Sequence, residues 1–155
     1  MLKAGDRAPD LTLPDQDGQP VRLSQLLAEG PLVLYFYPAD FTPGCTKEAC
    51  AIRDMHQELL DAGVRVAGVS PQDSASHARF RARHGLQFTL LADTDKTAIK
   101  AFGVDGPLGI GVRRATYLIS PEGVIEDRVL ADVMVGKHAE FIRHAADAAR
   151  RSAGG

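Results

Sequence analysis

The two cysteines of this 155-residue chain, Cys45 and Cys50, lie five residues apart and could carry thiol chemistry. They follow Thr42 and Pro43, a pair typical of a helix start, because Thr is a good N-cap residue and Pro suits the first helical position. Cys45 would then be the third residue of a helix. There the free backbone amides and the helix dipole favour a thiolate, which is the nucleophilic form of cysteine. The stretch therefore predicts a reactive Cys45.

The spacing of the cysteines also limits how they could pair. In a regular helix, a separation of five residues gives about 140° of rotation and about 7.5 Å of rise. The Cα atoms of Cys45 and Cys50 would then lie roughly 8–9 Å apart, beyond the usual disulfide limit of about 7 Å. A bond between them therefore requires the first turns of the helix to unwind.

Hydrophobic patterning predicts the elements that position these cysteines. The apolar run 32–37 indicates a buried central strand, which Pro38 ends because proline cannot extend the hydrogen-bond ladder. Further strands are predicted at 10–14, 21–23, 64–70, 88–92, 115–119 and 124–130. Helices are predicted at 25–28 with Ser24 as cap, from Thr42 to near Gly63, from the Ser74 cap to Gly85, at 96–102 and at 137–150.

The order of these elements predicts the fold class. Turn residues at 15–19 join the first two strands, and those at 120–123 join the last two. Strands and helices alternate between these two hairpins. We therefore expect a three-layer α/β/α sandwich with a mixed central sheet and an N-terminal β-hairpin extension.

Length and composition indicate one domain over residues 1–155, with a flexible tail from about residue 151. The net charge of -2 gives no electrostatic case for nucleic acid or an anionic membrane. No apolar run approaches the roughly 20 residues of a membrane span, and we expect no signal peptide. The expected compartment is a reducing cytoplasm, where two close cysteines are more often redox-active or metal-binding than a structural staple.

The motif Pro38-x-x-x-Thr42-x-x-Cys45 resembles the active-site motif of the peroxiredoxins. Cys50 is similar to the resolving cysteine of the bacterioferritin-comigratory-protein subgroup, also called peroxiredoxin Q. The resemblance covers nearly the whole chain, including the stretches 5–11, 13–18, 36–38, 50–54 and 114–119. It implies a thioredoxin fold and a thiol-dependent peroxidase that needs no metal or organic cofactor.

The resemblance implies a different role for each cysteine. Cys45 would be the peroxidatic residue, which hydrogen peroxide or an organic hydroperoxide oxidises to a sulfenic acid. Cys50 would condense with that sulfenic acid to an intramolecular disulfide. A thioredoxin or a glutaredoxin-type dithiol would then reduce the disulfide. The subgroup further implies a monomer, with a weak dimer as the alternative.

The resemblance also assigns the pocket around Cys45. Pro38 and Thr42 match the loop residues that shape the peroxide pocket, and Arg114 matches the pocket arginine. Arg113 is adjacent, but alternation along the strand points it to the other face. The remaining residues expected to contact the substrate are Phe41, Pro43 and Gly44.

Each of these residues also has a purely structural interpretation. Cys45 could be inert, Cys50 could be a small buried hydrophobe, and Thr42 could act only as an N-cap. Pro38 could simply end a strand, and Arg114 could be an exposed strand charge. The peroxidase interpretation is favoured because these residue types occur together at this spacing.

Two other functions use similar residues. A thiol–disulfide oxidoreductase of the same fold usually has Cys-x-x-Cys, whereas four residues separate these cysteines. A non-enzymatic redox sensor would form the disulfide but recycle slowly. A metal site is not predicted, because His77 and His84 share a helix face without an evident third ligand. Arg79, Arg81 and Arg83 of that helix are expected to form a solvated face.

Overall fold

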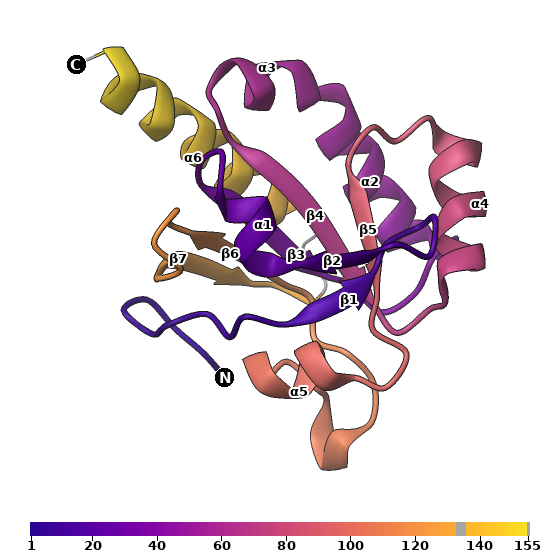
Figure 1. Ribbon diagram of the computed structural model, residues 1–155. Helices are drawn as coiled ribbons and strands as arrows, with labels where there is room; N and C mark the ends of the chain where they lie inside the picture. The colour runs from indigo at the N-terminus through magenta and orange to yellow at the C-terminus, as the bar shows by residue number, and fades with distance from the viewer. Residues whose placement is uncertain (133–135, 155) are drawn as a thin grey trace.

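The computed structural model describes residues 1–132 and 136–154, and its centre is a five-stranded sheet (Figure 1). The strands lie in the order β5–β4–β3–β6–β7. Their bounds are Leu32–Phe36 for β3, Arg65–Ser70 for β4, Thr89–Ala92 for β5, Ala115–Ile119 for β6 and Ile125–Leu130 for β7. β3, β4 and β5 are parallel, whereas β6 and β7 run antiparallel to their neighbours, so the sheet is mixed as predicted.

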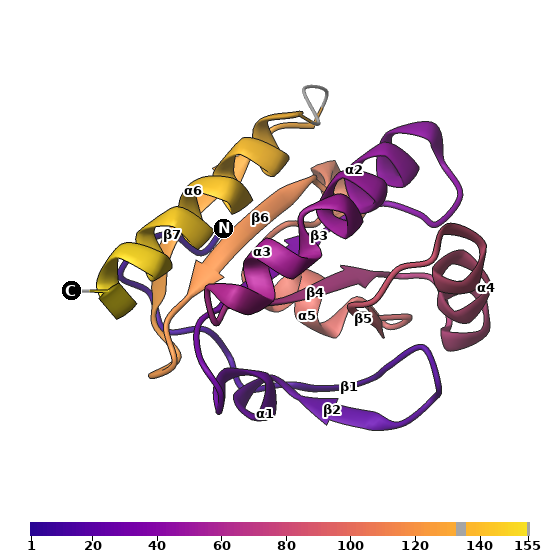
Figure 2. The same cartoon turned by 90° about the horizontal axis from the view of Figure 1, so that it is seen from above.

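Helices cover both faces of this sheet. The bounds are Leu23–Leu27 for α1, Pro43–Asp54 for α2, His56–Asp61 for α3, Ser74–His84 for α4, Thr97–Phe102 for α5 and Gly136–Gly154 for α6. Figures 1 and 2 show α2, α3 and α6 over one face, with α5 on the opposite side. Apolar residues of α1 and α5 pack in one buried cluster, and those of α2, α3, α4 and α6 pack in a second. The predicted three-layer sandwich is therefore confirmed.

The predicted N-terminal hairpin is formed by β1 (Thr12–Pro14) and β2 (Pro20–Arg22), which pair antiparallel. Its turn is closed by Asp15, whose Oδ1 accepts hydrogen bonds from the amides of Asp17 and Gln19, both at 2.9 Å. Gln16 then accepts the amide proton of Leu90 at 3.1 Å. This last bond ties the hairpin to β5 at the edge of the sheet.

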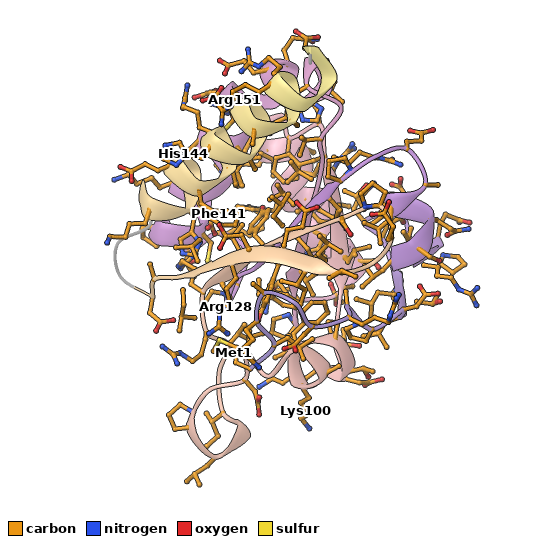
Figure 3. The ribbon with its side chains drawn as sticks, turned by 90° about the vertical axis from the view of Figure 1, so that its left-hand side faces the viewer. Met1, Lys100, Arg128, Phe141, His144 and Arg151 are labelled. Carbon is orange, nitrogen blue, oxygen red and sulfur yellow. The ribbon has the colours of Figure 1, made fainter. Side chains whose placement is uncertain are left out.

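The first residues of the chain are held against the antiparallel side of the sheet. The carbonyl of Leu2 accepts hydrogen bonds from Tyr117 Oη at 3.0 Å and from Arg128 Nη1 at 2.6 Å. Figure 3 shows Arg128 beside Met1, with Phe141, His144 and Arg151 along α6. Within residues 1–132 and 136–154, none of the helices combines the length and apolarity needed to cross a membrane.

Several helix boundaries differ from the predicted ones. The helix expected from Thr42 to near Gly63 is divided at Met55, whose backbone (φ -102, ψ 7) departs from helical geometry and ends the hydrogen-bond ladder of α2. The N-cap of α4 is Asp73 rather than Ser74, because the Asp73 carboxylate accepts the amide proton of Ser76 at 2.8 Å. Gly85 ends α4 in the left-handed conformation, as its sequence position predicts.

The first and last helices also differ. Ser24 does not cap α1, which begins at Leu23, and the Ser24 amide instead donates to Asp10 at 3.0 Å. A carboxylate from a distant loop thus takes the place that the local sequence suggested for Ser24. α6 begins at Gly136 and continues to Gly154, beyond both ends of the predicted 137–150.

Candidate active site

Cys45 lies in the first turn of α2, directly after the central strand. Thr42 occupies the N-cap position and Pro43 the first helical position, so Cys45 is the third helical residue, as predicted. Its side chain is only 1% exposed and packs in the cluster that contains Tyr35 and Tyr37. The first four amides of a helix have no partner within the helix, so this turn offers donors beside a buried thiol.

The Thr42 side chain does not cap the helix, although its backbone is in the N-cap position. Its hydroxyl donates to the carbonyl of Ala39 at 3.1 Å, which closes the loop before α2. A hydroxyl has one proton but two lone pairs. The Thr42 oxygen can therefore still accept a hydrogen bond from another group.

Arg114, the residue just before β6, brings a positive charge to Cys45. Both terminal nitrogens of its guanidinium, Nη1 and Nη2, donate to Cys45 Sγ at 3.3 Å. The antiparallel register pairs Phe36, the last residue of β3, with Ala115. Arg114 therefore lies beside the loop that leads to α2, even though 69 residues separate it from Cys45 in the chain.

Asp132 holds the two neighbouring arginines in different directions. Its Oδ1 accepts the backbone amide of Arg114 at 2.9 Å, and its Oδ2 accepts Arg113 Nη2 at 2.8 Å. The hydrogen bond from Arg113 holds the pKa of Asp132 below its usual value. Arg113 is thus directed to Asp132 and Arg114 to Cys45, which agrees with the alternation expected from the sequence.

Glu48 completes the buried site, and the sequence analysis missed it. Its Oε1 accepts Arg114 Nη1 at 3.1 Å, and the residue is only 2% exposed. Burial raises the pKa of Glu48 to about 7, although the hydrogen-bonded Arg114 opposes this shift. Its position three residues after Cys45 was the available signal, because residues i and i+3 share one side of a helix.

His138 of α6 lies beyond Glu48 and was also missed. Its Nδ1 is 2.7 Å from Thr116 Oγ1, and its Nε2 is 2.9 Å from the carbonyl of Ala131. A carbonyl only accepts, so Nε2 carries a proton, and in the neutral tautomer Nδ1 accepts the proton of the Thr116 hydroxyl. Burial lowers the pKa of His138, which agrees with this neutral form.

A second buried polar cluster anchors the loop between β3 and α2. Asp40 accepts hydrogen bonds from Tyr37 Oη and Ser76 Oγ, and His77 Nδ1 lies beside it, all three at 2.7 Å. His77 Nε2 is 3.0 Å from the carbonyl of Leu91. Because both acceptors are oxygens, these contacts suit a doubly protonated imidazolium paired with a carboxylate. The sequence analysis considered His77 only as a metal ligand and did not identify Asp40.

Replacing Asp40 with asparagine should destabilise the folded protein by roughly 3 kcal/mol or more, because breaking a buried ion pair leaves an uncompensated charge. Burial alone would raise the pKa of Asp40, but hydrogen bonds from His77, Tyr37 and Ser76 outweigh it and hold the pKa below its usual value. The stabilisation is therefore present above the unfolded-state pKa and is lost as the pH falls through the folded-state pKa. Urea unfolding from neutral to acid pH measures this loss.

The matched control is Asp54→Asn, which removes an exposed carboxylate that pairs with Arg53 at 3.0 Å. An exposed pair of this kind contributes little to stability, because water screens it. The free-energy difference between Asp40→Asn and the natural protein should shrink in acid, where the Asp40 carboxylate becomes protonated. Equal effects of the two substitutions at neutral pH would contradict the anchoring role of Asp40.

The other residues predicted for the pocket border this site. Pro38 is half-buried. It follows Tyr37, whose amide donates the last hydrogen bond to β4, at 3.0 Å to the carbonyl of Val69. Pro43 is exposed, and Gly44 is half-buried in the first turn of α2. Within the described residues, the side-chain hydrogen bonds to Cys45 come from Arg114 and not from these three residues.

Phe41 has an unusual backbone conformation next to the site. Its φ is 64°, in the left-handed region that costs a residue with a side chain about 1–2 kcal/mol. Its half-exposed ring packs edge-on against Phe80, with centroids 5.2 Å apart. The ring therefore covers α4 at the surface beside the loop, packed against Phe80 and His84.

Cys50 lies on the same continuous helix and is half-buried with a free thiol. It shares one side of α2 with Arg53, three residues later, whose Nη1 donates to the carbonyl of His84 at 2.8 Å. Cys50 therefore faces α4, whereas Cys45 faces Arg114. With α2 intact from Pro43 to Asp54, the structure has the arrangement in which the two cysteines are too far apart to bond.

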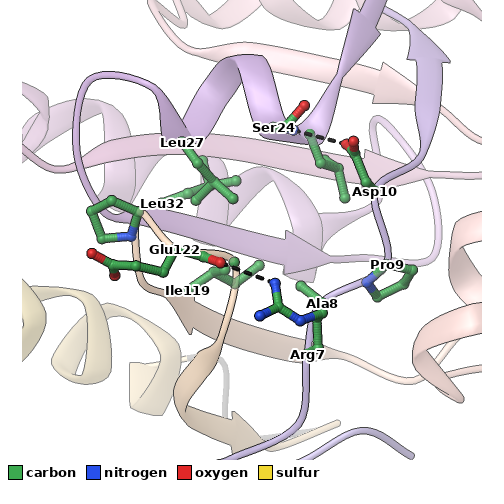
Figure 4. Close-up of a pocket in the computed structure, with 12 residues that line it drawn as sticks. Arg7, Ala8, Pro9, Asp10, Ser24, Leu27, Leu32, Ile119 and Glu122 are labelled. Carbon is green, nitrogen blue, oxygen red and sulfur yellow. Dashed lines mark hydrogen bonds between the residues drawn. The ribbon is translucent and has the colours of Figure 1, made fainter.

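The structure also contains a cavity of about 500 Å³ that does not belong to this site. Figure 4 shows Arg7, Asp10, Leu27, Leu32 and Ile119 around it, with Arg7 donating to the carbonyl of Glu122 at 3.2 Å. Leu32 begins β3 and pairs with Ile119 at the end of β6. The cavity therefore lies at the end of the sheet opposite to Cys45.

Comparisons with known proteins identify the family to which this fold belongs. The model of the AhpC/TSA family matches residues 4–128. The chloroplastic peroxiredoxin Q of Arabidopsis thaliana is 48% identical over 126 residues, which cover 81% of this chain and 58% of that protein. The chain thus spans little more than half the length of the plant relatives.

Solved structures give a closer match in length. The peroxidoxin BcpB of Mycobacterium tuberculosis is 38% identical with a TM-score of 0.89, and the alignment covers 96% of this chain and 98% of that one. Peroxiredoxin Q of Xanthomonas campestris is 35% identical with a TM-score of 0.81, covering 89% and 90%. The chain therefore belongs to the AhpC/TSA family, and within it to the peroxiredoxin Q and bacterioferritin comigratory protein group. The predicted thioredoxin fold is confirmed by these neighbours.

Proposed function

We propose that the chain is a thiol peroxidase that reduces hydrogen peroxide and organic hydroperoxides with Cys45. The observation that carries the proposal is the buried Cys45 sulfur, held 3.3 Å from both terminal nitrogens of Arg114 at the start of α2. A cation and a helix N-terminus both favour the thiolate. Further support comes from a bacterioferritin comigratory protein of Xanthomonas campestris, 35% identical to this chain, which is described by its alkyl peroxide reduction activity.

In the proposed reaction, the Cys45 thiolate attacks the terminal oxygen of the hydroperoxide. A sulfur–oxygen bond forms, the oxygen–oxygen bond breaks, and water or an alcohol leaves after taking up a proton. Arg114 donates hydrogen bonds to the reacting oxygens and stabilises the developing charge. Thr42, whose own proton is used by Ala39, accepts the hydrogen bond of the peroxide O–H and orients it.

Cys50 is the proposed resolving residue. Its thiol condenses with the Cys45 sulfenic acid, a disulfide forms, and water leaves. The first turns of α2 must unwind for this step, since both cysteines lie on one helix. A dithiol protein of the thioredoxin type, in a reducing compartment such as the cytoplasm, is the proposed reductant that restores both thiols.

Intact-mass measurement after one equivalent of hydrogen peroxide tests the two cysteine roles. The natural protein should lose about two mass units, because the disulfide forms with loss of two hydrogens. Cys50→Ser should instead gain one oxygen as a trapped sulfenic acid, and Cys45→Ser should remain unchanged. Gain of oxygen without a disulfide in the natural protein would point to an external resolving thiol.

Oxidation of Cys45 by peroxide, together with recycling by thioredoxin, distinguishes a peroxidase from a thiol–disulfide oxidoreductase and from a redox sensor. A protein that reduces insulin disulfides but leaves Cys45 unoxidised by peroxide would be a thiol–disulfide oxidoreductase. A protein that forms the disulfide but is reduced only slowly by thioredoxin would be a redox sensor. Sustained peroxide consumption with thioredoxin as the electron donor supports the peroxidase.

A further inference from the structure

One buried cation contacts two acids in this site. The Arg114 guanidinium donates to Cys45 Sγ at 3.3 Å and to Glu48 Oε1 at 3.1 Å. Arg114, Cys45 and Glu48 are 7%, 1% and 2% exposed. Water therefore does little to screen these charges, and the charge on one acid affects the other strongly.

The other titratable groups that face Glu48 add no positive charge. His138 from α6 has Nδ1 at 3.7 Å from Glu48 Oε2, but burial lowers the pKa of His138 and so favours its neutral form. Tyr35 from β3 is fully buried, and desolvation followed by the charge of Glu48 raises its pKa well above the usual value, so it also stays neutral. Among the residues that the structure describes, the charged group in contact with Glu48 is therefore Arg114, just before β6.

Glu48 has an oxygen that is not satisfied as a carboxylate. Its Oε2 is buried without a hydrogen-bond partner among the residues the structure describes. A buried carboxylate oxygen in this state is costly, whereas a protonated carboxyl has less need of a partner. His138 Nδ1 lies 3.7 Å from this oxygen, which is too long for a hydrogen bond.

We propose that Cys45 and Glu48 share a single negative charge opposite Arg114, so that Glu48 carries the proton while Cys45 is a thiolate. Ionising both acids would leave a net negative charge in a site closed to water. Two interacting groups of this kind titrate as a pair. The pKa of about 7 to which burial raises Glu48 agrees with a carboxyl that is protonated near neutral pH.

This inference rests on the proposed function and accounts for the charge and proton balance of the peroxide step. The thiolate takes the hydroxyl group of the hydroperoxide, which forms the sulfur–oxygen bond and releases an alkoxide. The alkoxide takes up one proton and leaves as the alcohol, and Glu48 gives up one proton and becomes a carboxylate. Sulfur is oxidised, the peroxide is reduced, and the cluster stays neutral throughout. Glu48 contacts Arg114 rather than the peroxide, so it is a positioning residue.

Infrared difference spectroscopy on Cys50→Ser tests the shared charge directly, because Cys45 is then the sole thiol. Oxidation by one equivalent of hydrogen peroxide should abolish the C=O stretch of a protonated carboxyl and produce a carboxylate band. The same difference should be absent when Glu48→Gln is added. Glu58→Gln is the matched control, because Glu58 is exposed on α3 and pairs only weakly with Arg143 at 3.8 Å.

Titration of the thiolate by its ultraviolet absorbance gives a second readout. Glu48 is already protonated when the thiolate forms, so Glu48→Gln exchanges one neutral group for another and should leave the midpoint of thiolate formation within about half a pH unit. A midpoint lower by about one unit or more would show that Glu48 was ionised beside the thiolate and would overturn the shared charge. Glu58→Gln should not move the titration. A carboxyl band unaffected by oxidation in Cys50→Ser would overturn the shared charge even if Glu48→Gln failed to fold.

The mass of each oxidised sample distinguishes a failure of the shared charge from a failure of the proposed function. If Cys45 gains oxygen and no carboxyl band changes, the peroxidase proposal stands and the shared charge is wrong. If Cys45 does not react with peroxide at all, the proposed function itself fails.

Discussion

Arg114→Met should lower kcat/KM for hydrogen peroxide about a hundred- to a thousand-fold. Both terminal nitrogens of Arg114 contact the Cys45 sulfur at 3.3 Å, so the substitution removes two charge-assisted donors from the reacting atom. Loss of one preorganised donor in an oxyanion site commonly costs a factor of this size. Stopped-flow measurement of Cys45 oxidation isolates the step from disulfide formation and recycling.

Arg113→Met is the matched control for Arg114→Met. Arg113 is the adjacent residue of the same type, but its guanidinium pairs with Asp132 at 2.8 Å in a partly exposed position. Such a pair contributes about 1 kcal/mol or less, so the rate should stay within about threefold. A fall of less than tenfold in Arg114→Met, or an equal fall in both variants, would remove Arg114 from the reaction.

Arg114→Lys separates charge from geometry. Lysine keeps the positive charge but has one compact ammonium in place of a planar fork. The guanidinium contacts Cys45 and Glu48 together, through Nη1 and Nη2, and a single ammonium cannot reproduce that arrangement. We therefore expect a rate between those of the natural protein and Arg114→Met.

The stability of the folded protein should also depend on pH through Glu48. Its folded-state pKa of about 7 lies above its ordinary value of 4.5, so the folded state binds the extra proton between these two pH values. Stability from this group therefore falls as the pH rises through that range. The same dependence should be absent in Glu48→Gln, and urea unfolding at several pH values measures it.

Local patterns predicted most of the architecture. The unbroken apolar run before Pro38 corresponds to β3, which is buried along its whole length. The Thr42–Pro43 pair placed the start of α2 correctly, because capping depends on residues that are neighbours in the chain. The left-handed Gly85 and the turn at 120–123 were predictable for the same reason.

Long-range polar contacts were not predictable from these patterns. Asp40 and Glu48 are buried because their partners come from other elements, namely His77 of α4 and Arg114 before β6. A single sequence favours exposed positions for acidic residues, because they are almost never buried without a partner. His138 was missed because its contacts, Thr116 and Ala131, depend on how α6 docks beside β6.

Formation of the Cys45–Cys50 disulfide should unwind the first turns of α2. In the structure these turns are helical and include the bond from the Thr46 amide to the Thr42 carbonyl at 2.8 Å. The helical spacing keeps the Cα atoms of the two cysteines roughly 8–9 Å apart, above the disulfide limit of about 7 Å. Hydrogen–deuterium exchange of residues 43–50 should therefore accelerate by at least about a hundredfold in the oxidised protein.

Cys50→Ser treated with the same peroxide is the control for this prediction. It carries a sulfenic acid on Cys45 but cannot form the disulfide, so its α2 should keep slow exchange. Residues 115–119 of β6 should exchange alike in the reduced and oxidised proteins. Retention of slow exchange at residues 43–50 in a protein proved by mass to contain the disulfide would contradict the unwinding.

The contacts on either side of α2 set the limits of this change. Asp40 holds the preceding loop to α4 through Ser76 and His77, and Arg53 holds the end of the helix to the carbonyl of His84 at 2.8 Å. Both attachments lie outside the segment that the disulfide must distort. The increase in exchange should therefore be confined between Asp40 and Arg53. Unwinding between these two points would also carry Cys45 away from Arg114 and expose the disulfide to its reductant.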